Sequence, residues 1–308
     1  MNAMVCTQYG REYAFSPKEF PLPVPKDHEL LVRIHATTVA SGDVVRAKLG
    51  GFMKSKTGVL GQEFAGVVTA IGSKVTKYRV NDRVFGIVST NTHAEYMTVS
   101  EKASVGKIPE SVTFDAAASL PFGANTALHF LRKLCHIRKD QQVLIHGASG
   151  AIGTFAVQYA KYVGAEVTGV CSAKNLELVR KIGADEVIDY TQEDFRSRNK
   201  RYDIIFNTVG HLPYGTVKHL LKDKGIYATT YLNGPLVARS VWSRMFGGKK
   251  VKCGIVLHQP GNVDVVSELL AQGAVQGVID SIYPLHELAQ AFRLVEQGHK
   301  TGSVIIHP

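Results

Sequence analysis

The stretch His146-Gly147-Ala148-Ser149-Gly150-Ala151-Ile152-Gly153 decides the fold of this chain. It follows the apolar run Val143-Leu144-Ile145, which is typical of a buried strand, and precedes apolar residues spaced for one face of a helix over 152–163. Glycines at a strand-to-helix turn let the backbone approach a pyrophosphate, and the helix N-terminus offers free N–H groups. A packing turn would contain the same glycines, but the strand-turn-helix order favours a dinucleotide site.

The chain after residue 140 alternates short apolar runs with amphipathic stretches. The segments between the runs include predicted helices over 175–182 and 214–222, and the predicted strands are 143–145, 167–170, 187–188, 203–206 and 226–228. Strands separated by helices at this rhythm are βαβ units of a parallel sheet, and two such halves form a doubly wound (Rossmann) sheet. The sequence therefore predicts an α/β fold for this part of the chain.

Residues 1–120 follow another pattern. Runs typical of strands, such as 30–34, 64–68 and 83–86, are punctuated by Gly, Asn and Asp, and helical periodicity is weak. A mainly antiparallel, barrel-like β domain is predicted here. The apolar run 304–306 near the end of the sequence is expected to return to this domain as a strand.

Length, composition and charge limit the classes of function. The chain has 308 residues, enough for two domains, and none of its apolar runs reaches the roughly 18–20 residues of a membrane span. The net charge of +10 suits an anionic ligand, but the basic residues are dispersed, so nucleic acid is disfavoured as a partner. The four cysteines are scattered and no secretory signal pattern is present, which indicates a cytoplasmic protein.

The end of the second predicted strand of the α/β part indicates which dinucleotide is bound. NAD enzymes usually place Asp or Glu there, where it hydrogen-bonds the ribose 2′-hydroxyl. This chain instead has Cys171-Ser172-Ala173-Lys174-Asn175. A hydroxyl and an ammonium group at the opening of a helix suit the 2′-phosphate of NADPH, which a carboxylate would repel. Ser172, Lys174 and Asn175 are therefore predicted NADPH contacts, although a capped helix start with a solvated lysine would look the same.

Five further segments form an ordered set: Val39-Ala40-Ser41-Gly42-Asp43-Val44-Val45-Arg46, Gly61-Gln62-Glu63-Phe64-Ala65-Gly66, Asn81-Asp82-Arg83-Val84-Phe85-Gly86, Leu120-Pro121-Phe122-Gly123-Ala124-Asn125-Thr126-Ala127 and Val187-Ile188-Asp189-Tyr190. They resemble motifs of the zinc-independent medium-chain dehydrogenases/reductases, namely N-x-x-D-x-x-x-R, G-x-E-x-A-G, G-D-x-V-x-G, L-P-x-x-x-x-T-A and V-I-D-Y. This family includes quinone and enone oxidoreductases and proteins often labelled NAD(P)-dependent alcohol dehydrogenases. The resemblance extends along nearly the full chain.

The resemblance implies a domain plan and a set of cofactor contacts. A GroES-like catalytic domain, 1–118 plus 258–308, would be interrupted by a Rossmann NADPH-binding domain, 119–257. Relatives of this kind form dimers or tetramers, so a homodimer is expected. The cofactor contacts expected from the glycine turn and from the resemblance are Thr126, Ser149, Gly150, Ala151, Ile152, Gly153, Tyr190, Val209 and Gly210.

The chain departs from the family pattern where chemistry is expected. Ser41 and Gln62 stand where zinc-dependent relatives carry a Cys-containing loop and a His, so no metal is predicted. Asn207 replaces the usual Asp of an F-D-T-V-G stretch. Val44 and Val45 stand where many relatives have Tyr or Lys near the active site, so the sequence identifies no proton donor.

Without a metal, hydride transfer favours substrates that are already activated, namely quinones and α,β-unsaturated carbonyl compounds. Ser41, Asn125 and Thr126 are the candidates for orienting such a substrate, although Ser41 would also serve as a loop cap and the other two as N-terminal helix residues. One alternative is a zinc-free alcohol dehydrogenase or carbonyl reductase. Another is an NADPH-binding regulatory or nucleic-acid-binding protein without turnover. The expected partner is a small quinone or enone, with no membrane involved.

Overall fold

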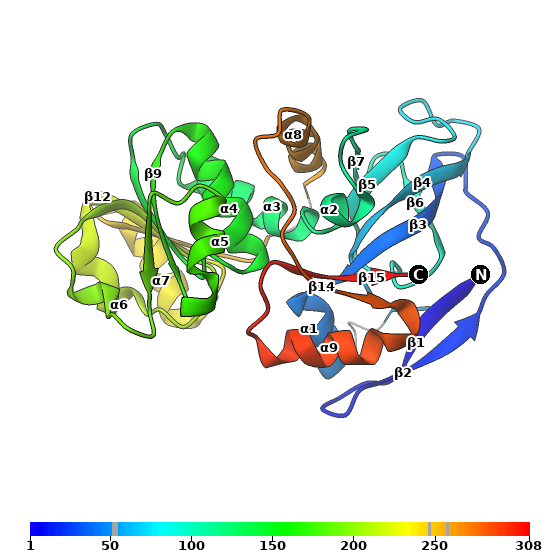
Figure 1. Ribbon diagram of the computed structural model, residues 1–308, viewed down its shortest axis with the longest axis horizontal. Coiled ribbons are helices and arrows are strands. Elements are labelled where there is room, and N and C mark those ends of the chain that lie inside the picture. Colours follow the sequence, from blue (N-terminus) through cyan, green and yellow to red (C-terminus); the bar gives the residue numbers. More distant parts are fainter. Residues whose placement is uncertain (51–54, 246–247, 257–258) are drawn as a thin grey trace. The chain divides into compact units, whose positions relative to one another are not determined.

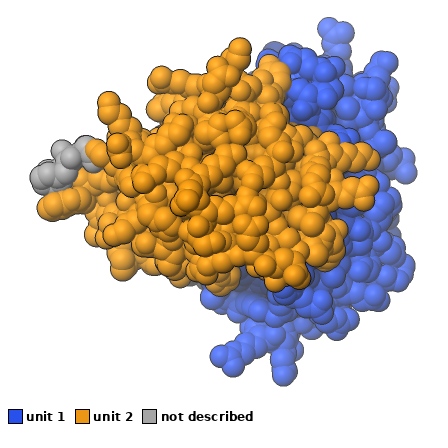
Figure 2. Space-filling model, turned by 60° about the vertical axis from the view of Figure 1, so that its left-hand side comes forward, with its two compact units in different colours: residues 1–122, 258–308 blue, residues 123–257 orange. Residues whose placement is uncertain are grey.

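The computed structural model describes residues 1–50, 55–245, 248–256 and 259–308. Contacts divide the chain into two units, unit 1 (Met1–Phe122 with His258–Pro308) and unit 2 (Gly123–Leu257), which Figure 2 colours separately. Whether these units fold independently as the two predicted domains stays a prediction. None of the described helices combines the length and the apolar character that crossing a bilayer would require.

Unit 2 contains a parallel sheet of six strands in the order β10-β9-β8-β11-β12-β13. Figure 1 labels β9 and β12 of this sheet and its helix α4. The strands are β8 (Gln142–His146), β9 (Glu166–Cys171), β10 (Glu186–Asp189), β11 (Tyr202–Asn207), β12 (Leu221–Thr229) and β13 (Lys250–Cys253). The order runs outward from β8 in one direction and from β11 in the other, which confirms the predicted doubly wound arrangement. The helices of this unit are α4 (Ala151–Val163), α5 (Leu176–Lys181), α6 (Tyr214–Val217) and α7 (Gly234–Met245).

Helix α4 forms where the apolar spacing predicts it. Phe155, Ala156 and Ala160 on its apolar side are buried, and the helix packs on β8 and β9. Gly164 ends the helix with a left-handed φ of 87°, and its N–H donates to the carbonyl of Ala160. The packing of α4 on the sheet fixes its N-terminus beside the carboxyl end of β8.

Unit 1 is built mainly from antiparallel strands, as predicted. Its larger sheet has seven strands, with the path β14-β15-β3-β4-β5-β7 and β6 paired to β3, while β1 and β2 form a separate pair. The strands are β1 (Asn2–Gln8), β2 (Ala14–Glu19), β3 (Glu29–Val39), β4 (Glu63–Ile71), β5 (Arg83–Ile87), β6 (Tyr96–Ser100), β7 (Ser104–Lys107), β14 (Ile279–Pro284) and β15 (Ser303–His307). The C-terminal strand β15 pairs with β14 and β3, so the expected return to the first part of the chain is confirmed.

The helices of unit 1 are α1 (Ser41–Leu49), α2 (Phe114–Ala118), α8 (Pro260–Ala271) and α9 (Leu288–Gln297). Helix α9 buries Leu288, Ala291, Phe292 and Val295 and contacts α1. A further helix, α3 (Pro121–Ala127), begins in unit 1 and ends in unit 2.

Candidate functional site

The loops after the parallel strands of unit 2 carry most of the predicted cofactor contacts. Residues 147–153 follow β8, Ser172–Asn175 follow β9, Tyr190 follows β10, and Val209 and Gly210 follow β11. Because all strands of this sheet run in one direction, these loops lie at one edge of it. In a doubly wound sheet, ligands bind at this edge, where the strand order reverses.

The loop after β8 is fixed by backbone contacts with its neighbours. The N–H groups of Gly147 and Ala148 both donate to the carbonyl of Val170, each at 3.0 Å. Gly147 has a φ of 83°, and a Cβ built on it would lie 2.2 Å from Cγ2 of Val209. The loops after β8 and β11 are therefore in direct contact, and only glycine fits at position 147.

The two glycines at the start of α4 differ in what surrounds them. A Cβ on Gly153 would lie 2.0 Å from the carbonyl oxygen of Gly147, whereas a Cβ on Gly150 would meet only that oxygen, at an ordinary 3.6 Å. Gly153 is thus required by the loop's own backbone. No protein atom requires glycine at position 150, so space is left there for a ligand. Gly150 is the N-cap, where glycine is among the preferred residues but not required.

The first turn of α4 presents three N–H groups ahead of its hydrogen-bond ladder. The first backbone bond within this helix runs from Thr154 N to the carbonyl of Gly150, at 2.8 Å. The N–H groups of Ala151, Ile152 and Gly153 precede it, and such groups have no partner within the helix. Together with the open side of Gly150, they form a cradle suited to a pyrophosphate.

The end of β9 is tied to the glycine loop through Asn175. This residue is buried, and its Nδ2 donates to Oγ of Ser149 at 3.0 Å. Lys174 is exposed beside it, and Ser172 is half-buried. The expected contacts from two loops therefore lie together, and Asn175 also has a role in joining them.

Tyr190 lies next to the end of β9, since its N–H donates to the carbonyl of Cys171 at 3.1 Å. Its side chain is half exposed. The neighbouring carboxylate of Asp189 accepts from N and Oγ1 of Thr191, at 3.0 and 2.8 Å, so it is engaged in its own turn.

Asn207 organises the loop after β11, a role that sequence reasoning did not recognise. Its side chain is fully buried, and Oδ1 accepts from the N–H groups of Val209 and Gly210, each at 3.2 Å. Nδ1 of His146 lies 3.1 Å from the same oxygen, and Nδ2 donates to the hydroxyl of Tyr227 at 3.1 Å. One amide thus connects the ends of β8, β11 and β12.

His146 is half-buried and belongs to this network. Burial lowers its pKa, and the hydrogen bond with Asn207 partly opposes that effect. The imidazole is therefore neutral at physiological pH, with the proton on Nδ1 facing Oδ1 of Asn207.

Asn125 and Thr126 do not stand at a helix N-terminus, so that reading is wrong. They lie beyond the first turn of α3, which continues directly as a π-helix over Leu128–Leu134, and are buried, with 3% and 6% of their surface exposed. At the start of unit 2, Gly123 approaches α4 closely, because a Cβ there would lie 2.2 Å from the carbonyl of Ala151. This places α3 beside the glycine loop, with Thr126 in its last turn.

Ser41 belongs to unit 1, where it is the exposed first residue of α1. It is not a cap, so that alternative is also wrong. The N-cap is Ala40, whose N–H donates to Oδ2 of Asp43 at 2.9 Å. Asp43 therefore caps the helix in place of Ser41. Its buried carboxylate also accepts from Nε2 of Gln62, at 3.2 Å.

Glu63 is a buried carboxylate that ties three segments of unit 1 together. Its Oε1 accepts from the N–H of Phe122 at 2.7 Å, and its Oε2 accepts from the hydroxyl of Thr38. Burial raises the pKa of Glu63 to about 7, and the two hydrogen bonds only partly offset that rise. The carboxylate thus fixes the segment that leads into α3. In the described residues, no group of three or more His, Cys, Asp or Glu side chains is arranged to hold a metal ion.

Glu63 should make the protein less stable as pH rises from about 4.5 to about 7. In this window the native state retains a proton that the unfolded state has released, so the free energy of unfolding falls with pH. Glu63→Gln keeps a side-chain oxygen that can accept from the N–H of Phe122, and it removes the titrating carboxyl group. Denaturant unfolding should show the variant gaining stability relative to the wild type across this window, by up to about 3 kcal/mol. A difference that is constant with pH would contradict this expectation.

Comparison with known proteins identifies the family. Residues 26–163 match the family described as "Alcohol dehydrogenase GroES-like domain", and residues 182–306 match the one described as "Zinc-binding dehydrogenase". A chloroplastic quinone-oxidoreductase homolog of Spinacia oleracea is 30% identical over 100% of this chain and 98% of its own length. The mitochondrial NAD(P)H oxidoreductase RTN4IP1 of Mus musculus is 31% identical over 100% of this chain and 89% of its own.

Solved structures agree on the fold. The quinone oxidoreductase from Coxiella burnetii superposes with a TM-score of 0.84 at 24% identity, covering 100% of both chains. A structure described as an NAD-dependent alcohol dehydrogenase gives 0.87 at 22% identity, again over 100% of both chains. The ordered motifs, the two units and these full-length matches agree. The chain belongs to the quinone-oxidoreductase-like branch of the medium-chain dehydrogenase/reductase family of oxidoreductases.

Proposed function

We propose that this protein is an NADPH-dependent, zinc-free reductase that transfers hydride to quinones or α,β-unsaturated carbonyl compounds. The observation that carries the proposal is the cradle at the start of α4, where, among the described residues, a Cβ on Gly150 would meet only the carbonyl oxygen of Gly147, at 3.6 Å. Relatives support the choice of reaction. One is named a quinone-oxidoreductase homolog, and another, from Arabidopsis thaliana and 28% identical, is named an NADPH-dependent alkenal/one oxidoreductase.

The described residues suit the parts of NADPH in a definite way. The N–H groups of Ala151, Ile152 and Gly153 would hold the pyrophosphate, and Ser172 with Lys174 would hold the 2′-phosphate. Further proposed cofactor contacts are Thr126, Ser149, Asn175, Tyr190, Val209 and Gly210. The bound nicotinamide would supply the hydride, and Ser41, Asn125 and Thr126 are proposed to orient the substrate.

Turnover against a substrate panel tests the reaction and its independence from zinc. NADPH consumption should be fastest with quinones and enones and slow with simple aldehydes, and alcohols with NADP⁺ should form no NADPH. Ser41 is exposed and Gln62 is engaged with Asp43, so chelators should leave the rates unchanged. Faster turnover of alcohols, or activity that requires stoichiometric zinc, would favour the alcohol dehydrogenase alternative. NADPH binding without any turnover would favour a regulatory role.

Lys174→Ala should weaken NADPH binding roughly tenfold and leave NADH binding nearly unchanged, because only NADPH carries the 2′-phosphate. The wild type should bind NADPH at least tenfold more tightly than NADH, or about 1.4 kcal/mol. Calorimetry with both cofactors measures these constants. Lys181→Ala, which removes an exposed lysine from α5, is the matched control and should affect neither cofactor. Equal affinities of the wild type for the two cofactors would contradict the preference.

We also propose a homodimer. Strand β13 stands at the end of its sheet and pairs, among the described strands, with β12 alone. Nearby, Trp242 and Ile255 expose 64% and 78% of their surface, which suits a covered face. Light scattering should give twice the mass of one chain, and Trp242→Glu should reduce it, whereas Val45→Glu in unit 1 should not. A wild-type mass of one chain would refute the dimer.

A cytoplasmic location stays a prediction, since several relatives are named as chloroplastic or mitochondrial proteins.

A further inference from the structure

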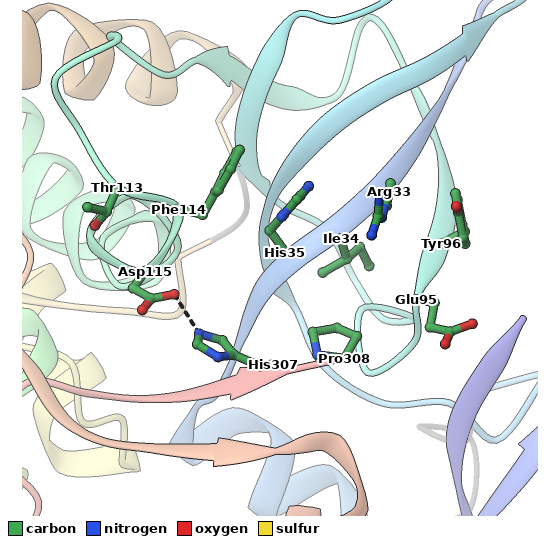
Figure 3. A pocket seen from close by; sticks show the side chains of 10 residues that line it. All are labelled: Arg33, Ile34, His35, Glu95, Tyr96, Thr113, Phe114, Asp115, His307 and Pro308. Carbon is green, nitrogen blue, oxygen red and sulfur yellow. Dashed lines mark hydrogen bonds and ion pairs between the residues drawn. The ribbon is translucent and has the colours of Figure 1, made fainter.

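Unit 1 has a cavity of about 580 Å³ that is lined only by residues of this unit (Figure 3). It is lined by residues from β3, from the start of β6, from the region of α2 and from the end of β15. This volume falls within the range of about 300–1,000 Å³ that small-molecule sites occupy. None of the proposed cofactor or substrate residues lines it.

Three hydrogen-bond donors line one side of this cavity. Arg33 and His35 alternate along β3, so their side chains share a face of the sheet, while Ile34 between them is buried in the core. Tyr96 is the cross-strand partner of Arg33 in the β3–β6 register, which places it on the same face. Within the described part of the chain, none of these three side chains makes a hydrogen bond or an ion pair.

The wall beside these donors is held rigidly. The ring of His35 stacks on Phe114 with centroids 4.3 Å apart and planes inclined by 14°. The guanidinium of Arg83 lies 4.7 Å from the centroid of Phe114 and donates to the carbonyls of Pro109 and Glu110, each at 3.0 Å. The position of the imidazole is therefore set by packing. Arg83 adds a positive charge that no described carboxylate pairs.

The charges around His35 are mainly positive. Burial lowers the pKa of His35, and Arg33, Arg83 and His307 lower it further. Two carboxylates also line the cavity, and the charge of Glu95 acts on Arg33. Asp115 pairs with His307 at 2.8 Å, and Glu95 accepts from N and Nδ2 of Asn2 at 2.7 and 3.1 Å. The cavity therefore holds charges of both signs, and an anion entering it would compete with Glu95 for Arg33 while meeting the hydrogen-bond donors of Arg33, His35 and Tyr96 that no described residue occupies.

We propose that this cavity binds a small organic anion, whose carboxylate or phosphate group is held by Arg33, His35 and Tyr96. Arg33 supplies a planar set of N–H donors, which matches an oxyanion, and the phenol adds an O–H donor. The anion stabilises the protonated form of His35, so the imidazole becomes a second charged donor when the site fills. All the residues belong to unit 1, so the proposal does not depend on the dinucleotide site.

The test is a titration of the whole protein with inorganic phosphate, benzoate and phenyl phosphate, followed by calorimetry and by the NMR signals of the His35 ring. Saturable binding should shift these signals and raise the pKa of His35. Binding should also tighten as pH falls, because the anion favours the protonated imidazole. Comparison of benzoate with the two phosphates distinguishes a carboxylate site from a phosphate site.

Arg33→Met should weaken binding of the best probe roughly tenfold or more. Arg33 is exposed, so this variant should remain folded and should bind the dinucleotide as the wild type does. Arg79→Met removes an exposed arginine elsewhere in unit 1 and should leave anion binding unchanged. The proposal fails if no probe shifts the His35 signals saturably. It also fails if the two arginine variants weaken binding equally, because the effect would then reflect only the net charge of the protein.

Discussion

Gly150→Val should reduce NADPH binding roughly a hundredfold while the protein stays folded. A Cβ at this position meets only the carbonyl of Gly147, at 3.6 Å, so the protein itself tolerates a side chain. The branched methyl groups of valine would instead occupy the space in front of the N–H groups of Ala151 and Ile152, where the pyrophosphate is proposed to bind. Calorimetry with NADPH, together with a denaturant unfolding curve, measures both parts of this expectation.

Gly153→Ala is the matched control because it adds less volume to the same turn. Its Cβ would lie 2.0 Å from the carbonyl of Gly147, so the loop or the helix must shift. We expect a loss of about 1–3 kcal/mol in unfolding free energy, as for other overpacked sites. Gly150→Val should lose at most about 1 kcal/mol, typical of an N-cap change. A folded Gly150→Val protein with native NADPH affinity would reduce the motif to a packing turn and remove the main support for the proposed function.

Asn207→Leu should have the largest effect on stability, because the leucine cannot replace the amide oxygen. The N–H groups of Val209 and Gly210 and Nδ1 of His146 would lose their common acceptor. Buried donors without partners cost about 1–3 kcal/mol each, so we expect a loss of about 3–5 kcal/mol in unfolding free energy. NADPH affinity should also fall, since the loop that contains Val209 and Gly210 would no longer be fixed.

Asn207→Asp separates the acceptor from the amide. A carboxylate keeps an oxygen for Val209, Gly210 and His146, so the loop should retain its conformation. The negative charge should raise the pKa of His146, which NMR titration of its ring can follow. If Asn207→Leu were as stable as Asn207→Asp, the amide oxygen would not hold the loop.

The periodicity of apolar residues was sufficient to predict the parallel sheet, because five of its strands are short buried runs between amphipathic helices. The limits of elements were less predictable. Residues 214–222 suggested one helix; the helical stretch, α6 followed by a 3-10 turn over Lys218–Leu220, ends at Leu220, and Leu221 already lies in β12. Leu221 pairs with Tyr202 of β11, so sheet hydrogen bonds outweigh the local helical pattern. β13 was not predicted at all, because three of its four residues are Lys250, Lys252 and Cys253 at the edge of the sheet.

The parts of the candidate site that a local sequence motif forms with its own backbone could be predicted. The contacts between side chains of different loops could not. The glycine turn and the acid-free end of β9 are visible in the sequence. The roles of Asn207 and Asp43 are not, because each depends on partners that other segments bring within hydrogen-bond distance. Asn125 and Thr126 were assigned to the first turn of a helix that begins at Pro121, whereas they lie one turn further along it.

The position of β15 between β14 and β3 has a consequence for how the chain folds during its synthesis. Val39 of β3 pairs with Val304, so the end of β3, Thr37–Val39, waits for a segment made some 265 residues later, whereas Glu29–Arg33 pair on that side with β6. During synthesis, unit 2 can complete its sheet while this end of β3 still lacks a neighbour on one side, and unpaired strand edges invite pairing with other chains. We expect ribosome-bound chains stalled before residue 303 to protect unit 2 from protease and to leave unit 1 susceptible. Chaperones should accordingly be needed mainly by the first 122 residues, which are synthesised first but complete their strand pairing last.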